Sequence, residues 1–326
     1  MNRRLLVGGL AVVIVLVLLG TVIGVALAVF GTATAAAGPT ATLTVFTGSA
    51  RIRKSGSTTT VAAHSGEAVA SGDSVSTAAN SKAAVTYPDG SVTRLDSSSR
   101  ITLSLARAGR SAFRLSISQT AGLSWNTVKK LVGAGSFRIS GPNNAVAGVR
   151  GTRFGFYIEK SPAGKTVVWV DVYDGVVAVS GAVGPSVTAT ANQRVNVSAG
   201  TAPSSPVTIP DSDRHLSFTV FNQALEAVTG KPVGFYNGVL SSGQTAGPLT
   251  YAADGKGDLE FVLGWPGSIF ELTVVDPAGT IFAQPAATAT PIVVRVPRAV
   301  AGSWQFRVRD VTSVPLEPWW VVVGRS

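Results

Sequence analysis

Two acidic residues stand at a spacing that could hold a metal ion. Asp254 and Asp258 enclose the short run Gly-Lys-Gly, and carboxylate oxygens together with backbone carbonyls are the ligands that Ca²⁺ prefers. The run is shorter and less acidic than an EF-hand loop, and a hairpin turn is the commoner use of such a sequence. Calcium binding is therefore one hypothesis for this run, and an ordinary turn is its alternative.

Residues that could support catalysis are few and scattered. His64 and His215 are far apart, and neither has a neighbouring ligand at a metal-binding spacing, which favours surface or helix-capping roles. Asp171 and Asp174 would not share one face of a strand, which argues against a glycosidase pair. The sequence has no cysteine, no Gly-x-Ser-x-Gly elbow and no phosphate-binding loop. We predict a non-enzymatic protein without a cofactor, and keep a cell-wall or polysaccharide hydrolase with an unrecognised site as the alternative.

Basic residues give the strongest signal for binding. Residues 40–200 contain 17 Lys and Arg against seven Asp and Glu, whereas residues 201–326 contain eight against ten. Such an excess favours an anionic envelope polymer or the acidic face of another envelope protein. The alternative is that strand alternation spreads the charges without forming a patch. The candidate binding residues are Arg94, Arg100, Arg107, Arg110, Arg114, Lys129, Lys130 and Arg150.

An apolar run from Leu5 to Phe30 predicts where these residues lie. It holds 26 residues without a charge, 18 of them Leu, Val, Ile or Phe. A helix of this length spans roughly 39 Å, more than the roughly 30 Å hydrocarbon core of a bilayer. Arg3 and Arg4 precede it, and no Lys or Arg occurs between it and Arg51, which predicts a cytoplasmic N-terminus. We expect a single-pass protein of the cytoplasmic membrane, with residues 1–4 inside, the bulk outside and no nucleic-acid partner.

The same run leaves two further questions open. Ala35-Ala36-Ala37 could be cut by signal peptidase, although the apolar core of a signal peptide is normally about 7 to 15 residues. Gly20, Gly24 and Ala28 make one face of the helix small, which would allow two helices to pack as a homodimer. The alternative is that Gly and Ala are simply common in membrane helices.

After a tether at residues 31–40, the sequence is typical of an all-β protein. Apolar and polar residues alternate in runs of about five residues, separated by turn residues. Asp89-Gly90 predicts a hairpin turn in which both central residues can take positive φ, and Trp125–Val132 is a candidate helical turn. Three apolar strand faces are predicted, and they consist of Phe113, Leu115 and Ile117, of Phe154, Phe156 and Ile158, and of Val168, Val170 and Val172.

Five motifs in a fixed order resemble the FecR-type domain of bacterial extracytoplasmic proteins, over about residues 41–200. This resemblance implies an all-β, solenoid-like or twisted multi-sheet module that works by protein or ligand contact. Well-known members carry a cytoplasmic anti-sigma domain, for which residues 1–4 are too few, so a signalling component without its own anti-sigma domain is a further alternative. The motifs are Gly72-Asp73-x-Val75-x-Thr77, Asp89-Gly90-Ser91 with Leu95, Val149 to Phe154, Asp174 to Val179, and Ala191-Asn192-Gln193.

Two glycines in the third motif have expected structural roles. Gly148 and Gly151 permit either positive φ or a close backbone approach, while Val149 and Phe154 supply core area. We expect Arg150 to satisfy backbone carbonyls or an acidic side chain, and contact with a ligand is the alternative.

Residues 201–232 predict a linker and a short helix. Proline recurs up to Pro210, and apolar residues then follow at helical spacing from Phe218 to Val228. Asp211 or Ser212 is the expected cap, and Gly230 is the expected stop.

Residues 233–326 return to strand alternation and predict a small β-sandwich. The strings Leu272–Gly279 and Ala301–Val308 resemble pre-peptidase C-terminal or similar jelly-roll modules, which implies a non-catalytic accessory or binding domain. Trp319 and Trp320 should point to opposite sides of a last strand, so that one of them faces outward. We predict a membrane-anchored extracytoplasmic binding or scaffold protein.

Overall fold

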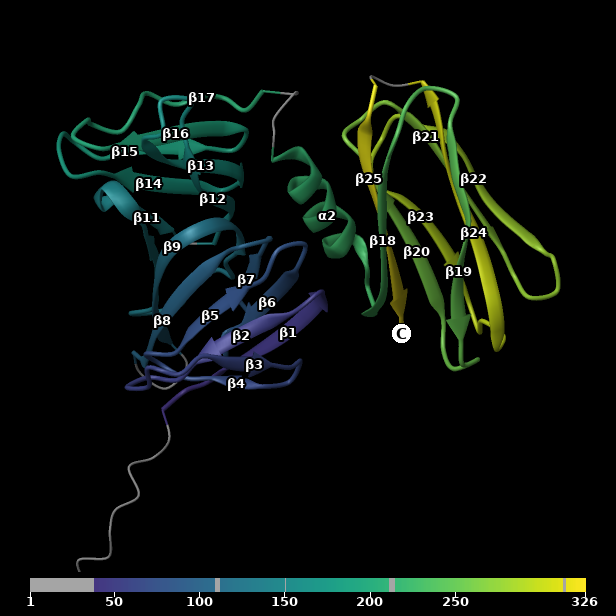
Figure 1. The fold of residues 1–326 in the computed structure, drawn as a ribbon, viewed down its shortest axis with the longest axis horizontal. Coiled ribbons are helices and arrows are strands. Elements are labelled where there is room, and N and C mark those ends of the chain that lie inside the picture. Colours follow the sequence, from purple (N-terminus) through teal and green to yellow (C-terminus); the bar gives the residue numbers. More distant parts are fainter. Residues whose placement is uncertain (1–37, 109–111, 150, 211–214, 313–314) are drawn as a thin grey trace, which may run out of the picture. The chain divides into compact units, whose positions relative to one another are not determined.

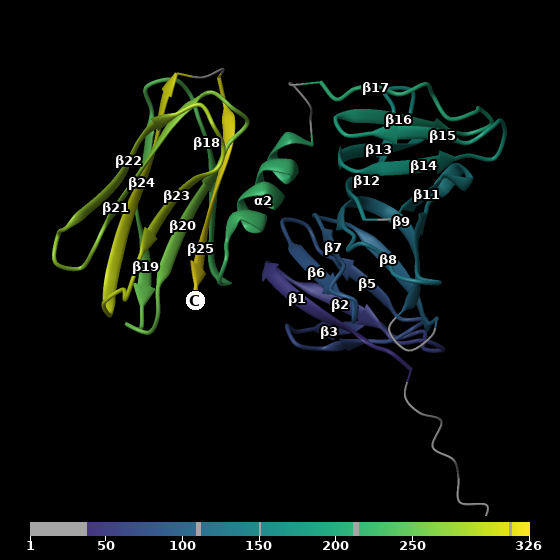
Figure 2. The same cartoon turned by 180° about the vertical axis from the view of Figure 1, so that it is seen from behind.

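Strands make up most of the chain that the computed structural model describes, namely residues 38–108, 112–149, 151–210, 215–312 and 315–326. Residues 39–326 form one compact unit, which Figures 1 and 2 show from opposite sides. In the described residues, no helix has both the length and the apolar character needed to cross a membrane. The predicted anchor at residues 5–30, with Gly20, Gly24 and Ala28, lies outside the described residues.

The first β region is built around a long strand, β9 (Phe113–Thr127), that belongs to two sheets. The first part of β9 pairs with β8 and β10 in sheet B, and its last part pairs with β7 and β12 in sheet A. Gly122, with a φ of +75°, lies where the strand passes from one sheet to the other. A side chain there would collide with Ser99, because an added Cβ would lie 2.5 Å from the Ser99 Cα atom.

Sheet A is antiparallel and takes strands from both ends of this region (Figure 1). Its order is β4 (Ala68–Val69), β1 (Ala41–Thr47), β6 (Lys82–Thr86), β7 (Val92–Leu95), the last part of β9, β12 (Arg153–Lys160), β13 (Thr166–Asp174), β16 (Gln193–Ser198) and β17 (Val207–Thr208).

Sheet B lies against sheet A and includes the parallel pairing of β9 with β10. Its order is β3 (Val61–Ala63), β2 (Ala50–Arg53), β5 (Ser74–Thr77), β8 (Arg100–Arg107), the first part of β9, β10 (Ser136–Ser140), β11 (Val146–Val149), β14 (Val176–Ser180) and β15 (Val187–Thr190), and the 3₁₀ turn η1 (Pro142–Asn144) precedes β11.

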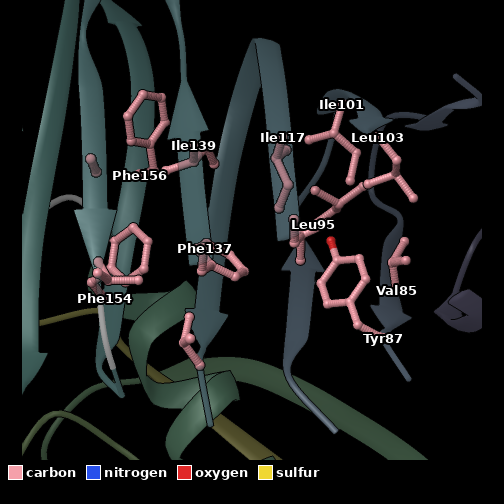
Figure 3. Close-up of a cluster of buried hydrophobic side chains, with 14 of the residues drawn as sticks. Val85, Tyr87, Leu95, Ile101, Leu103, Ile117, Phe137, Ile139, Phe154 and Phe156 are labelled. Atoms are coloured by element: carbon pink, nitrogen blue, oxygen red, sulfur yellow. The ribbon is translucent and has the colours of Figure 1, made fainter. Parts of the chain in front are cut away.

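The apolar faces of sheets A and B form one core, part of which Figure 3 shows. Phe137 of β10 meets Phe154 of β12 edge-on, with ring centroids 6.1 Å apart. The three predicted apolar faces contribute to this core or pack against it, so alternation predicted them correctly. A hairpin joins β6 to β7 at Asp89-Gly90 as predicted, but only Gly90 of this pair has a positive φ. The Gly90 amide donates to the Tyr87 carbonyl at 2.9 Å, so Pro88 and Asp89 are the central residues of the turn. The Asp89 carboxylate accepts a hydrogen bond from the Ser91 amide at 2.9 Å.

The second β region is a sandwich of two further sheets around its own core. Its core includes the alternating apolar residues of two strands, namely Phe270, Leu272 and Val274 and Trp304, Phe306 and Val308. Sheet C has the order β18 (Lys231–Leu240), β25 (Glu317–Arg325), β20 (Leu259–Gly264) and β23 (Ile292–Val296), and sheet D has the order β19 (Thr245–Ala253), β24 (Gly302–Thr312), β21 (Ile269–Val275) and β22 (Ile281–Ala287).

Helix α2 (Leu216–Ala227) has apolar contacts with both β regions. A third cluster joins its Phe221 to Trp125 and Tyr157 of sheet A and to Trp320 of sheet C. The helix begins later than predicted: its N-cap residue is His215, whereas Asp211 or Ser212 was expected.

Two local predictions are wrong. Trp125–Thr127 forms the end of β9, so Trp125–Val132 is not a helical turn; Trp125 and Thr127 instead turn toward α2. Trp319 and Trp320 do point to opposite sides of β25, but both are buried. Trp319 lies in the sandwich core. Trp320 packs on Phe221, because α2 covers the face of β25 that was expected to be exposed.

Candidate anion-binding face

The outer face of sheet B carries five exposed arginines. They follow from alternation, since their neighbours Ile52, Ile101, Leu115 and Ile139 point into the core and each arginine therefore points outward. The five residues are Arg51 and Arg53 of β2, Arg100 of β8, Arg114 of β9 and Arg138 of β10.

Strand register places these arginines in rows with small polar residues. Ser76 of β5 pairs with Arg51 on one side and with Arg100 on the other. Because neighbouring strands lie about 4.8 Å apart, the Cα atoms of these two arginines are about 10 Å apart. Farther along the sheet, Arg138 pairs with Ser116, and Arg114 pairs with Ser136. The face is thus a grid of guanidinium groups separated by hydroxyls.

These arginines differ from the basic residues of sheet A in their partners. Among the described residues, none of the five takes part in an ion pair. On sheet A, Arg94 pairs with Glu226 at 2.9 Å and Arg194 forms a bidentate pair with Asp171 at 2.5 and 2.6 Å. The basic excess of the sequence is therefore divided between residues that hold the fold together and residues that face outward uncompensated.

The predicted binding residues separate accordingly. Arg100 and Arg114 lie on the arginine face, whereas Arg94 is used to dock α2. Arg107 stacks over the Phe113 ring at 5.4 Å, and Lys129 and Lys130 are exposed after β9. Arg110 and Arg150 lie outside the described residues.

Three residues of the arginine face are absent from that prediction. The alternation in Ala50-Arg51-Ile52-Arg53 and in Phe137-Arg138-Ile139 shows that these arginines point outward. It does not show that β2 and β10 belong to one sheet, because β2 reaches β10 only through β5, β8 and β9.

The two histidines occupy different environments. His64 is exposed, as predicted, whereas His215 is buried at the start of α2. The His215 Nε2 atom lies 2.8 Å from the Glu159 Oε1 atom, and its ring lies 4.2 Å from the Tyr157 ring. His215 is buried because the start of α2 packs on sheet A. The position of His215 in the sequence does not indicate this burial.

The carboxylates of the calcium hypothesis have protein partners. Asp254 accepts hydrogen bonds from Arg325 at 2.5 Å and from the Lys256 amide at 3.2 Å. Asp258 accepts one from the Arg298 amide at 2.8 Å. In the described part of the chain, no three His, Cys, Asp or Glu side chains are grouped as metal ligands would be.

Comparisons with known proteins agree with the resemblance seen in the motifs. Residues 73–178 match the family model described as FecR protein, which confirms the FecR-type prediction for this region. A comparison with curated proteins gives no match.

Two crystal structures of a candidate anti-sigma factor from Parabacteroides distasonis ATCC 8503 are similar to part of the chain. One has a TM-score of 0.35 at 17% identity and covers 46% of this chain and 64% of the other. The second has a TM-score of 0.36 at 15% identity and covers 52% and 68%.

Proposed function

We propose that this chain is a non-catalytic envelope protein that binds an anionic cell-envelope polymer through the outer face of sheet B. The observation that carries the proposal is the set of five exposed arginines that share this face without an ion pair in the described residues. Guanidinium groups without nearby carboxylates keep their charge and donors available for an external anion. The FecR match at residues 73–178 supports a role in binding at the envelope.

The form of the face favours a linear polymer over a folded protein partner. Protein interfaces usually depend on a few buried aromatic or apolar anchors, whereas the rows around these arginines carry mainly Ser and Thr. A chain with regularly repeated negative charges could contact several of the arginines at once. The proposal therefore commits to a polyanion, and an acidic protein partner is an outcome of the test.

The proposed location depends on the apolar run at residues 5–30. We propose that this run is a single span that holds the N-terminus inside and the described residues outside the cytoplasmic membrane. Protease added to intact protoplasts should then digest residues 39–326. Digestion only after the membrane is opened would contradict this topology.

Salt elution from an immobilised polyanion tests the binding proposal. The full chain in a neutral detergent should be retained and should elute with rising salt, because salt screens exposed charges. The triple variant Arg51→Gln, Arg114→Gln, Arg138→Gln should elute at clearly lower salt. The matched control changes Lys231, Lys256 and Arg307 of the sandwich to Gln, which removes the same charge from exposed residues without ion pairs in the described chain, and it should elute like the wild type.

Three results would contradict the proposal. Equal shifts for the two triple variants would mean that only net charge matters, and retention insensitive to salt would exclude an electrostatic contact. Arginine-dependent capture of an acidic envelope protein without polymer binding would assign the face to a protein partner.

Transmembrane signalling is a second candidate, supported by the FecR match alone. It predicts that a cytoplasmic partner co-purifies with the full chain from membranes. The hydrolase alternative predicts product release from peptidoglycan or polysaccharide, and an activity screen that finds such release would contradict a non-catalytic role.

A further inference from the structure

A small pocket on the arginine face is lined entirely by polar residues. Ser74 and Ser76 of β5 form its floor, with Arg53 on the β2 side and Arg100 on the β8 side. Thr58 and Thr60, from the loop between β2 and β3, complete its wall. Its volume is about 160 Å³, which suits a single small charged group.

The pocket offers donors from opposite sides. Arg53 uses one N–H toward the Ser74 hydroxyl at 3.5 Å, and the Ser74 and Thr102 hydroxyls are 2.6 Å apart. A guanidinium has five N–H donors, so most of those of Arg53 stay available. The Arg100 side chain forms no ion pair with any described residue, and Arg100 is one of the residues that line the pocket.

A buried carboxylate behind the pocket positions its loop. Asp73 accepts hydrogen bonds from the Ser55 and Ala70 amides, each at 2.9 Å, and from the Lys54 Nζ atom at 3.1 Å. Although burial raises the pKa of Asp73, these hydrogen bonds outweigh it and hold the pKa below its ordinary value. Asp73 therefore stays ionised and fixes the start of the loop that carries Thr58, and it is not one of the residues that line the pocket.

We propose that Arg53 and Arg100, with the hydroxyls around them, bind one phosphate group of a phosphodiester-linked envelope polymer. This inference rests on the proposed function and names the chemistry of the ligand. A phosphodiester has two charged non-bridging oxygens on a tetrahedral phosphorus, and their lone pairs do not lie in one plane, so it can accept from both guanidinium groups and from the serines together. A carboxylate also has two charged oxygens, but its lone pairs lie in one plane, so it suits a single guanidinium fork better than donors from opposite sides.

A polymer is the better source of this phosphate than a lipid surface. Proteins that lie on membranes present large apolar side chains that enter the lipid, whereas all the residues that line the pocket are polar. Arg138 and Arg114 lie on the same face beyond the pocket. A phosphodiester chain that starts in the pocket could continue across them.

The test compares two polymers and two double variants of the full chain in neutral detergent. The ligands are a labelled poly(glycerol phosphate) oligomer and a poly-glutamate oligomer of equal charge, with affinity measured by fluorescence anisotropy at one ionic strength. Arg53→Gln with Arg100→Gln should weaken phosphodiester binding by about tenfold or more, since hydrogen bonds between charged groups are the strong ones. The control pair Arg114→Gln with Arg138→Gln removes the same charge and should weaken binding of both polymers by a similar, smaller factor.

A charge-conserving pair separates pocket chemistry from general attraction. Arg53→Lys with Arg100→Lys keeps the charge but loses the planar fork, and it should bind poly-glutamate like the wild type while losing its preference for phosphodiester. Equal affinity of the wild type for both polymers, or equal losses for the two Gln pairs, would overturn the pocket while leaving the proposed function intact. Binding of neither polymer would overturn both. Binding to phosphatidylglycerol vesicles that requires Arg53 and Arg100, without binding to the oligomer, would contradict a polymer ligand and would assign the site to a lipid phosphate.

Discussion

The Arg94 Nη1 atom of β7 lies 2.9 Å from the Glu226 Oε1 atom of α2, and the pair joins residues that are 132 positions apart in the sequence. The same carboxylate oxygen accepts hydrogen bonds from the Trp125 Nε1 atom at 3.0 Å and from the Thr127 hydroxyl at 2.7 Å. Its other oxygen accepts one from Arg153 at 3.3 Å. One carboxylate on α2 thus collects four donors from sheet A.

Replacing Glu226 with Gln should lower the free energy of unfolding by about 2–4 kcal/mol. The amide has one acceptor oxygen instead of two and turns an N–H group toward a guanidinium, and breaking a largely buried ion pair is strongly destabilising. Urea unfolding followed by tryptophan fluorescence measures this change. As a control, Glu271→Gln removes an exposed pair with Arg309 and should cost less than about 1 kcal/mol. Similar losses for both variants would show that Glu226 does not anchor the helix.

Acid should weaken the same contact. Burial alone raises the pKa of Glu226, but the Arg94 charge and the hydrogen bonds from Thr127 and Trp125 outweigh it and hold the pKa below the ordinary value of 4.5. A depressed folded-state pKa contributes stability that is present above pH 4.5 and is lost as the pH falls toward the folded-state pKa. The unfolding free energy of the wild type should therefore fall below pH 4.5, and Glu226→Gln should show a smaller fall. Parallel pH profiles for the two proteins would contradict this.

Phe221 connects the two β regions and should control whether they unfold together. Its ring lies 5.9 Å from Phe46 of sheet A and 4.8 Å from Trp320 of sheet C. Phe221→Ala should cost about 3–5 kcal/mol and should separate urea unfolding into two transitions, because the cluster that couples the regions is lost. Phe306→Ala, in the core of the sandwich alone, is the control for loss of a buried ring. A single transition for Phe221→Ala would show that the two regions stay coupled without this ring.

Local alternation predicted the buried faces of several strands, although it missed the end of β9 at Trp125–Thr127. Phe154 and Phe156 reach the core as predicted because the side-chain period of a strand is a local property. Sheet order was not predictable in this way, since the passage of β9 from sheet B to sheet A and its parallel pairing with β10 depend on contacts between distant segments.

Contacts between distant segments also decide which arginines are available for binding, and the sequence does not show these contacts. Arg94 and Arg100 have the same type and similar surroundings in the sequence, yet one is used by Glu226 and the other faces outward. Arg94 lies on sheet A, where α2 supplies Glu226, whereas Arg100 lies on the outer face of sheet B. The arginine face likewise needs the order of its strands before Arg51 and Arg138 can be seen to share a surface.

The glycines of the Gly-Val-Arg-Gly motif should respond differently to a methyl group. Gly151 has a φ of +77°, and an added Cβ would lie 3.2 Å from the Lys130 Cα atom. Alanine there should cost about 1–2 kcal/mol, because the left-handed region alone costs an L-residue roughly that much. Gly148 pairs with Arg138 of β10, and its added Cβ would meet nothing within 4 Å. Gly148→Ala should therefore change the unfolding free energy by less than about 0.5 kcal/mol. Urea midpoints of the two variants measure the contrast, and an equal loss at both positions would mean that the motif is not kept for the conformation of Gly151.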